Sequence, residues 1–581
     1  MKKILFFAVS IMVMGTTMWG QSLNIGGHRA VKDARNNIWL CSVPQSLFGN
    51  DFTAAVSYGE ELSEFVIDGQ AVASGDTFVF TAIEGGKNYS VTAYMGDSLI
   101  TGDITFTWLP IVELEGEFGE YYQYGHVTVN EPESTESELM NAKLRWSGYI
   151  SSGVLNSKNK HSYTVIFVNE DSTKCDRTFF GLRNDSCWVL DAGTMDFLRV
   201  RTRVGDDLWL DMSRRPWYAD TMPDFHNGSR GKMVEVLLNG SYMGIYNMCE
   251  PIDRKQLELK EYDREKKEFH GQLWFANSWT RTAAMSEPEP LNSTSYYWDG
   301  VQVVYPKRSD VGKVDWTVFY NAVQFAYQAN LDEDMTAHAD SMGYYFDLPV
   351  MQDFYIFIVA LQSMSNETQN TYYSCYDKEE HPRLSMTPWD HYMSLGQSYN
   401  PAMYHSDLLA PDRPIDWVSQ IPMIYMMLQK DYYNEVIARY RELRQTVLDT
   451  DNLVNRYRSA VDELETCGAA AREEARWSRD RDLAKRKLDL SDEMDFVEGW
   501  IRARMEYLDE NVFIDWTDPE SPTLKGDVNG DGEVSIADIN RLIDIILGGE
   551  ADSDTLKRAD VNEDKEIGLA DVNLLVSIIL S

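Results

Sequence analysis

The stretch MVEVLLNGSYMGIYNMCEPIDRKQLEL, residues 233–259, decides how the middle of the chain folds. Apolar and polar residues alternate on both sides of Asn239-Gly240, and alternation with a period of two predicts strands. Asn-Gly is the favoured pair for a two-residue hairpin loop, because a type I′ turn needs positive φ at both positions. The stretch therefore predicts an antiparallel hairpin over 233–247.

Strand patterns continue on both sides of this hairpin before helical patterns take over. Residues 22–107 hold short alternating runs such as TFVFTAI and YSVTAYM, which predict a small antiparallel domain, a β-sandwich. Alternating runs continue from about 108 to 250. After about 312, helical periodicity and charge pairs four residues apart predict amphipathic helices, as over 432–464 and 492–512. The fold class expected is multidomain α+β.

Length and charge limit the possible partners. The chain has 581 residues, and single cores seldom exceed roughly 250–300 residues, so we expect about two to four domains. Its 92 acidic and 53 basic residues give a net charge of −39. This charge repels polyanions, so we expect no nucleic-acid partner.

The N-terminus has the pattern of a signal peptide. Lys2-Lys3 precede an apolar run from Ile4 to Met14 and then small residues, which is the order of charged, hydrophobic and cleavage regions. A signal anchor is the alternative, but the run is too short to span a bilayer and no later run reaches about 18 apolar residues. We expect a secreted protein, extracellular or attached to a cell surface, with no transmembrane segment in the mature chain.

The six cysteines do not form a metal-binding pattern. They are spread widely with no CxxC pair, which argues against structural zinc. Cys175 and Cys187 are the closest pair. Export would permit a disulfide between them, and buried free thiols are the other possibility.

A 33-residue repeat near the C-terminus predicts calcium sites. DVNGDGEVSIAD begins at Asp527 and DVNEDKEIGLAD at Asp560. An EF-type loop supplies oxygen ligands from positions 1, 3, 5, 7 and 12. The predicted ligands are Asp527, Asn529, Asp531, the Glu533 carbonyl and Asp538 in the first loop, and Asp560, Asn562, Asp564, the Glu566 carbonyl and Asp571 in the second. Gly532 suits the sharp turn at position 6, whereas Lys565 in the second loop predicts weaker binding.

Apolar positions after each loop repeat as well, which predicts two helices that pack together. Residues 526–581 resemble a type I dockerin, because both loops end in Asp at position 12. The resemblance implies Ca²⁺-dependent docking to a cohesin module on a scaffold or cell surface, and no chemistry of its own.

Three blocks in the middle of the chain resemble the CotH kinase family of secreted atypical protein kinases. They are the hairpin stretch 233–259, GLRNDSCWVLDAGTMDFLRVRTRVGDDLW at 181–209 and TPWDHYMSLG at 387–396. The resemblance covers about 108–512. It implies a two-lobed kinase-like domain, a β lobe followed by a helical lobe.

The resemblance also implies a site for ATP with Mg²⁺ or Mn²⁺. Gly148 would lie by the phosphates, with Lys160 as the nearby cation. Arg201 and Glu250 match further family positions, and Glu250 would contact the nucleotide. Lys160 could equally be a surface lysine, and Arg201 and Glu250 could be packing ion pairs.

The catalytic segment departs from the family pattern. Phosphoryl transfer needs acids that hold metal and a base for the incoming hydroxyl. Asn370 and Asp390 survive and could hold one metal ion, but Ser365 and Tyr392 stand where the family has acids. Glu367 could replace the base if the loop shifts. We expect phosphotransfer to a protein acceptor to be weak or lost.

Two further functions stay open. One is a non-catalytic interaction module presented at a surface. The other is an accessory or hydrolase component of a cellulosome-like extracellular complex for polysaccharide catabolism, because dockerins often accompany such enzymes. The predicted organisation is a signal peptide at 1–21, a β-sandwich-like domain at 22–107, a CotH kinase-like domain at 108–513, a linker at 514–525 and a type I dockerin at 526–581.

Overall fold

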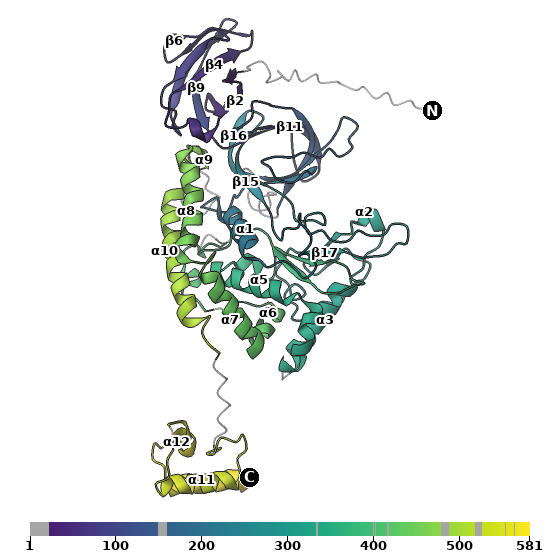
Figure 1. Ribbon diagram of the computed structural model, residues 1–581, viewed down its shortest axis with the longest axis vertical. Helices are drawn as coiled ribbons and strands as arrows, with labels where there is room; N and C mark the ends of the chain where they lie inside the picture. Colours follow the sequence, from purple (N-terminus) through teal and green to yellow (C-terminus); the bar gives the residue numbers. More distant parts are fainter. Residues whose placement is uncertain are drawn as a thin grey trace, which may run out of the picture. The chain divides into compact units, whose positions relative to one another are not determined.

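The computed structural model describes residues 23–148, 160–332, 335–398, 400, 403–414, 418–477, 487–516, 526–551, 553–562 and 564–580. The predicted signal peptide and most of the predicted linker lie outside these residues. The chain divides into two compact units, one ending at Phe513 and the other beginning at Ile514 (Figure 1).

The N-terminal β region of the large unit is, in the described part of the chain, a nine-stranded sheet, drawn in purple in Figure 1. Its order is β6-β5-β8-β9-β3-β2-β1-β4-β7, and among these described strands only β3 and β9 pair in parallel. Trp39, Phe80, Tyr89 and Phe106 fill its core. The strands are β1 (Leu23–Ile25), β2 (His28–Asp33), β3 (Ile38–Ser42), β4 (Phe52–Tyr58), β5 (Leu62–Ile67), β6 (Gln70–Ala71), β7 (Thr77–Phe80), β8 (Asn88–Met95) and β9 (Ser98–Thr107).

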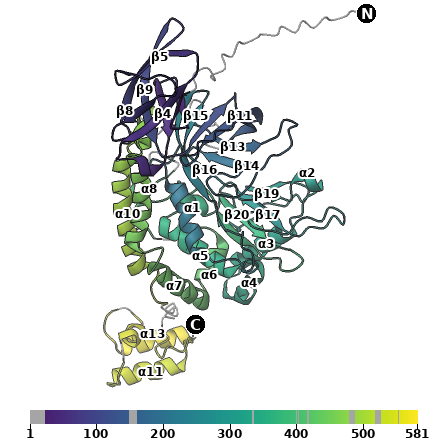
Figure 2. The same ribbon diagram turned by 45° about the horizontal axis from the view of Figure 1, so that its top comes forward.

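A closed barrel follows, in the order β10-β11-β12-β13-β14-β16-β15 (Figure 2). Parallel pairing of β10 with β15 closes it. Tyr163, Phe167, Trp188 and Tyr246 lie in its core. The β-rich character predicted for this part of the chain is confirmed. The strands are β10 (Ile111–Glu115), β11 (Gln123–Asn130), β12 (Met140–Ser147), β13 (Ser162–Phe167), β14 (Cys187–Asp191), β15 (Gly231–Leu238) and β16 (Ser241–Cys249).

The predicted hairpin is confirmed as β15 and β16. Leu238 pairs with Ser241, which leaves Asn239 and Gly240 as a two-residue loop. Their φ angles are +49° and +68°, as a type I′ turn requires. The Asn239 side chain accepts a hydrogen bond from Gly116 N and donates one to Gly116 O, each at 2.9 Å, so the turn is fixed to the loop after β10.

Gly240→Val should lower the free energy of unfolding by about 1–2 kcal/mol, because a side chain at positive φ crowds the backbone. Ser241→Val is the matched control, since a β-branched residue fits the adjacent strand position. Urea unfolding of both variants measures the difference. Equal midpoints for the two variants would contradict the expected strain.

A second sheet, in the order β18-β19-β17-β20-β21, lies beyond the barrel. Its strands are β17 (Gln272–Ala276), β18 (Tyr297–Trp298), β19 (Val301–Tyr305), β20 (Thr371–Cys375) and β21 (Ser385–Pro388). The helical character predicted after about 312 is confirmed, and β20 and β21 are two short strands in that part of the chain which the sequence did not predict. Runs as short as β20 and β21 carry too few residues for an alternating pattern to stand out.

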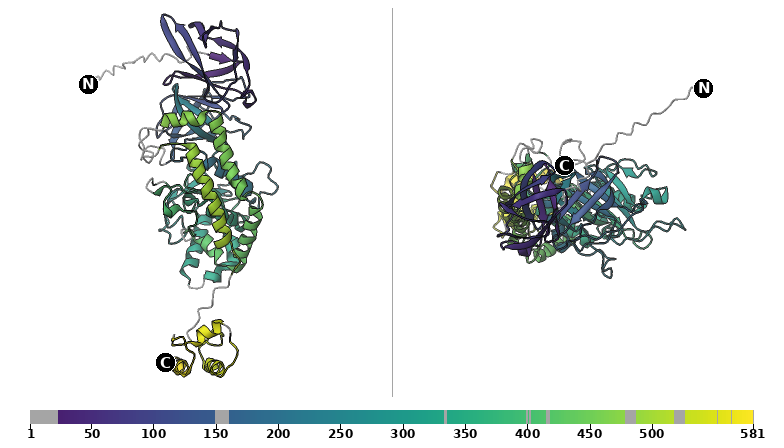
Figure 3. Two further views of the ribbon diagram at one scale, coloured as in Figure 1. Left: turned by 90° about the vertical axis from the view of Figure 1, so that its left-hand side faces the viewer. Right: turned by 90° about the horizontal axis from the view of Figure 1, so that it is seen from above.

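Helices complete the large unit. Helix α5 is buried from Val350 to Leu361 and packs against β21, α6, α7 and α10. The predicted helix over 432–464 is divided into two helices, α7 and α8, because Asp449 caps the start of α8. Helices α8 and α10 pack side by side (Figure 3). The helices are α1 (Arg201–Met212), α2 (Arg308–Val311), α3 (Thr317–Leu331), α4 (Met342–Tyr345), α5 (Leu348–Leu361), α6 (Ile421–Met427), α7 (Lys430–Arg444), α8 (Thr450–Thr466), α9 (Ala469–Trp477) and α10 (Leu490–Asn511).

The small unit consists of α11 (Ile536–Ile546), α12 (Ser553–Ala559) and α13 (Leu569–Leu580) with the two predicted calcium loops. Helices α11 and α13 pack together around Leu542 and Leu575, which confirms the predicted helix pair.

Cys175 and Cys187 are both free thiols, and both are half-buried, whereas the alternative without a disulfide expected buried thiols. Of the helices that the structure describes, none combines the length and apolar character needed to cross a membrane.

Candidate functional site

The pairing of β20 with β21 brings Asn370 and Asp390 to one end of the second sheet. Asn370 directly precedes β20, Asp390 follows β21, and Trp389 N donates to Asn370 O at 2.8 Å. Asn370 and Asp390 have positive φ angles of +51° and +60°. Such backbone strain persists only where the surroundings hold it, and it is common at functional sites. The structure thus places two predicted catalytic residues together.

Asp390 is partly buried beside helix α1, where the Thr202 hydroxyl lies 3.5 Å from its Oδ1. Burial raises the pKa of Asp390 well above its ordinary value, and Asp191 and Asp206 raise it further. Burial also raises the pKa of Asp191. Carboxylates that repel one another in this way would be stabilised by a cation between them. The sequence had not singled out Asp191 or Asp206.

The loop before β20 is held by the buried side chain of Asn366. Its Nδ2 donates to Asn370 O and Trp389 O, each at 2.9 Å. Its Oδ1 lies 3.0 Å from His391 Nδ1, and His391 Nε2 lies 3.2 Å from Asp206 Oδ1. A chain of polar contacts therefore connects this loop to α1. The only sequence signal for Asn366 and His391 was their position beside the predicted catalytic residues.

Ser365 and Tyr392, the two positions where we expect the family to have acids, are both buried. Ser365 Oγ donates to the backbone oxygen of Asp390 at 3.0 Å, and a hydroxyl cannot take a proton as a carboxylate does. Burial raises the pKa of Glu367, although hydrogen bonds from Ser419 act to lower it. Glu367 is thus tied to the segment before α6, and its role as a base stays a prediction.

Lys160 is buried just before β13 and forms an ion pair within the protein. Its Nζ lies 2.8 Å from Glu473 Oε1 on α9, and Arg199 Nε lies 2.7 Å from the same oxygen. Burial lowers the pKa of Lys160 to about 8, while Glu473 acts to raise it. Burial alone would raise the pKa of Glu473, but Lys160 and Arg199 hold it below its ordinary value.

This environment means that Lys160 is not a surface lysine. Gly148 lies in a turn after β12 with a φ of +79°, and the rest of the predicted phosphate loop, 149–159, lies outside the described residues. The roles of Gly148 and Lys160 toward ATP stay predictions.

Arg201 and Glu250 are fully buried and engaged with protein groups. Arg201 pairs with Asp196 and Glu493. Glu250 accepts hydrogen bonds from Arg183 N, His226 Nε2 and the Arg230 guanidinium. Burial would raise the pKa of Glu250, but these donors lower it to about 2. The packing alternative accounts for these contacts, and nucleotide binding by either residue stays a prediction.

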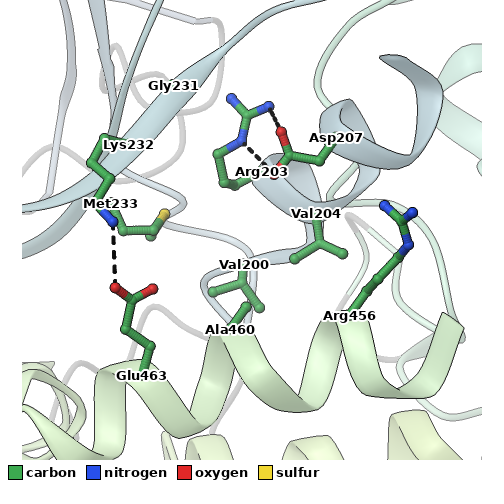
Figure 4. A pocket seen from close by; sticks show the side chains of 10 residues that line it. All are labelled: Val200, Arg203, Val204, Asp207, Gly231, Lys232, Met233, Arg456, Ala460 and Glu463. Atoms are coloured by element: carbon green, nitrogen blue, oxygen red, sulfur yellow. Dashed lines mark hydrogen bonds and ion pairs between the residues drawn. The ribbon is translucent and has the colours of Figure 1, made fainter. Parts of the chain in front are cut away.

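A cavity of about 260 Å³ opens between α1, β15 and α8 (Figure 4). Its charged side chains are paired, Arg203 with Asp207 at 2.6 Å and Lys232 with Glu463 at 3.4 Å. The lining residues are Val200, Arg203, Val204, Asp207, Gly231, Lys232, Met233, Arg456, Ala460 and Glu463. The residues predicted to bind ATP are not among them.

The first calcium loop has the expected shape. Asp527, Asp531 and Asp538 each offer a carboxylate oxygen, and these oxygens lie within 4.8 Å of one another. Gly532 has a φ of +88°, and its N–H donates to Asp527 Oδ2 at 2.9 Å. The donor set of carboxylates and carbonyls suits Ca²⁺.

The second loop adopts the same turn with a side chain at position 6. Lys565 has a φ of +69° and donates its N–H to Asp560 Oδ2 at 2.9 Å. In the described residues, three acids converge within 4.8 Å only in the first loop. Weaker Ca²⁺ binding by the second loop stays a prediction, and the wider spacing of its acids supports it.

Asp527→Ala with Asp531→Ala should remove more Ca²⁺ stabilisation than Asp560→Ala with Asp564→Ala. Ligand at 100 times its Kd stabilises a fold by about 2.7 kcal/mol, so loss of the tighter site costs more at a given Ca²⁺ concentration. Calorimetry on the 514–581 unit, with Ca²⁺ and with chelator, measures this. A melting profile that ignores Ca²⁺ would contradict it.

Comparison with protein families gives two matches. A family model described as CotH kinase protein matches residues 151–508, and a model described as dockerin type I domain matches residues 525–580. No curated protein matches the chain. Calcium binding and a cohesin partner follow from the dockerin match.

Proposed function

The chain belongs to the CotH kinase protein family, and we propose that it is an exported member which its dockerin attaches to a cohesin-bearing scaffold or cell surface. It binds ATP with Mg²⁺ or Mn²⁺, and phosphotransfer to a protein acceptor is weak or lost. The pattern of residues 1–21 supports export.

The proposed loss of phosphotransfer rests on Ser365. A positioned base must accept the proton of the incoming hydroxyl, and Ser365 is buried with its own hydroxyl hydrogen-bonded to the Asp390 carbonyl. Tyr392 removes a second acid from the same segment. Glu367, the remaining candidate base, is hydrogen-bonded to Ser419.

Nucleotide binding is supported by the residues that survive. Asn370 and Asp390 lie at one end of the sheet. Burial raises the pKa of Asp390 most, and the carboxylates of Asp191 and Asp206 raise it further. An amide and several carboxylate oxygens are the donors that Mg²⁺ prefers. The metal, when bound, would neutralise the phosphate charge of ATP. Asn370 and Asp390 would hold it.

Attachment through the small unit is supported by its surface. Four apolar side chains stand out from helices α11 and α13 or directly beside them, at 68–81% exposure: Ile536, Leu547, Leu569 and Leu580. Exposed apolar side chains that gather into one patch mark protein-binding surfaces, and the packing of α11 against α13 brings the two repeats together. The four side chains occupy equivalent positions in the two repeats.

A non-catalytic interaction module is the second candidate function. It is favoured by the ion pairs of Lys160 with Glu473 and of Glu250 with Arg230, because both predicted nucleotide-binding side chains already have charged partners within the protein. In this case ATP would not bind under any metal condition.

Two assays test the proposal. The full chain should be captured by immobilised cohesin in Ca²⁺ and released by chelator. Labelled ATP with Mg²⁺ or Mn²⁺ and casein-like acceptors should give little or no transfer. Capture that does not depend on Ca²⁺ would overturn the proposed attachment through the dockerin. Efficient transfer by the native protein would overturn the proposed loss of phosphotransfer.

A further inference from the structure

The outer wall of the barrel presents two polar side chains toward α1. Trp188 and Leu190 point into the barrel core, so Asp191, next on β14, points outward. On β16, Tyr246 and Met248 occupy the core, so Asn247 points outward as well. Asp191 and Asn247 are directly paired across the two strands, which places their side chains side by side.

Helix α1 contributes a third polar group to this region. Thr202 and Asp206 are four residues apart and share one helix face. The Thr202 hydroxyl lies 3.5 Å from Asp390 Oδ1, and Asp206 Oδ1 lies 3.2 Å from Nε2 of the next residue, His391. Asp206 and Asp390 therefore face the same interior region.

Several polar atoms here are buried without a hydrogen-bond partner in the described part of the chain. They are both amide atoms of Asn247, Asp206 Oδ2 and Arg203 Nη1. Asn247 is only 4% exposed and Asp206 2%. Asp206 Oδ2 and Arg203 Nη1 form an ion pair with each other, at 3.6 Å. Native proteins rarely leave such groups unsatisfied, so they indicate a bound species.

Gly231 leaves space for this group. A Cβ at Gly231 would lie 2.5 Å from Asn247 Oδ1, 2.7 Å from Cys249 Cβ and 2.8 Å from Arg203 Nη1, so a side chain there would displace these groups. In Figure 4 Arg203 is held by Asp207 next to the strand that carries Gly231. Asn247 Oδ1 and Arg203 Nη1 thus both lie next to Gly231, and Arg203 connects this position to Asp206 Oδ2.

We propose that Asp191 and Asp206 supply carboxylates in place of the acid that Tyr392 removed from the catalytic segment. Together with Asp390 they bind one divalent cation of the Mg²⁺ or Mn²⁺ class. The Asn247 amide oxygen is a further, neutral ligand. Carboxylate and amide oxygens are the donors that such hard cations take. The acids come from β14 and α1, outside the segment where the family pattern places them.

The spacing of these acids favours a hydrated ion. Within the described residues, three acids meet within 4.8 Å only in the first calcium loop, so Asp191, Asp206 and Asp390 are farther apart. Mg²⁺ keeps several waters and binds through one or two carboxylates, with the others reaching it through water. The inference rests on the proposed function in one respect, the assignment of Asp390 as a metal ligand.

Mn²⁺ binding to the full chain tests the inference, measured by electron paramagnetic resonance and calorimetry, with and without ATP. The calcium loops are disabled in all samples by Asp527→Ala, Asp531→Ala, Asp560→Ala and Asp564→Ala. We expect one bound Mn²⁺, weakened at least about tenfold by Asp191→Asn or Asp206→Asn. Asp211→Asn, at an exposed acid on α1, should change nothing.

Melting temperatures separate a metal ligand from a structural residue. Removing one of several repelling carboxylates should leave the metal-free melting temperature unchanged or higher, while the rise caused by Mn²⁺ disappears. A lower metal-free melting temperature in both Asn variants would show a purely structural role and overturn the inference.

Two other outcomes distinguish this inference from the proposed function. Normal Mn²⁺ binding by Asp191→Asn and Asp206→Asn, with loss in Asp390→Asn, would overturn the inference alone. No Mn²⁺ binding by the parent chain, with or without ATP, would mean that only water occupies the interior and would overturn both.

Discussion

Glu473→Ala should lower the free energy of unfolding of the large unit by about 3–5 kcal/mol, because it leaves two buried cations without their partner. Glu473 is fully buried, and Lys160 and Arg199 both contact its Oε1. Ile245 N donates to its Oε2 at 2.8 Å and would also lose its acceptor. Denaturant unfolding, monitored by tryptophan fluorescence, measures the change.

Glu465→Ala is the matched control for this variant. Glu465 is exposed near the end of α8, so its removal should change stability by no more than about 0.5 kcal/mol. A loss below about 1 kcal/mol for Glu473→Ala would contradict the account of Lys160 as a cation held by Glu473.

Ser365→Asp combined with Tyr392→Asp should raise phosphotransfer by about 10²–10⁴-fold, the usual contribution of a positioned general base. The change introduces acids at the two positions where the resemblance implies them. The new carboxylate at 365 must turn away from the Asp390 carbonyl that Ser365 now contacts. Transfer from labelled ATP to a casein-like acceptor, measured with Mg²⁺ or Mn²⁺, gives the rate.

Ser365→Asn combined with Tyr392→Asn controls for shape without charge. Equal rates for the Asp and Asn pairs would mean that the missing acids do not limit transfer. If the native protein already transfers efficiently, Glu367→Gln should abolish that activity, because Glu367 would then be the base.

Local patterns predicted the features that depend on neighbours in sequence. The Asn239-Gly240 turn follows from the need for positive φ, and both residues adopt it. The helix over 492–512 appears as α10. The first calcium loop brings Asp527, Asp531 and Asp538 together, since its ligands lie within twelve residues.

Contacts between distant segments could not be read in the same way. Lys160 and Glu473 are 313 residues apart, and no local pattern links them. Asp206 and Asp207 are adjacent in the sequence, yet the side chain of Asp206 is 2% exposed and that of Asp207 is 55% exposed. The difference depends on which face of α1 packs against the protein, and a sequence of neighbouring acids does not reveal it.

Calorimetric titration of the chain with ATP is the most direct test of the central claim, that nucleotide binding persists where phosphotransfer has weakened. The calcium loops are disabled by the four alanine substitutions given above, and phosphate release is recorded in the same samples. We predict ATP binding only with Mg²⁺ or Mn²⁺ present, no binding by Asp390→Ala, and very slow or absent turnover. No ATP binding under any metal condition, or rapid turnover by the unaltered catalytic segment, would contradict the account.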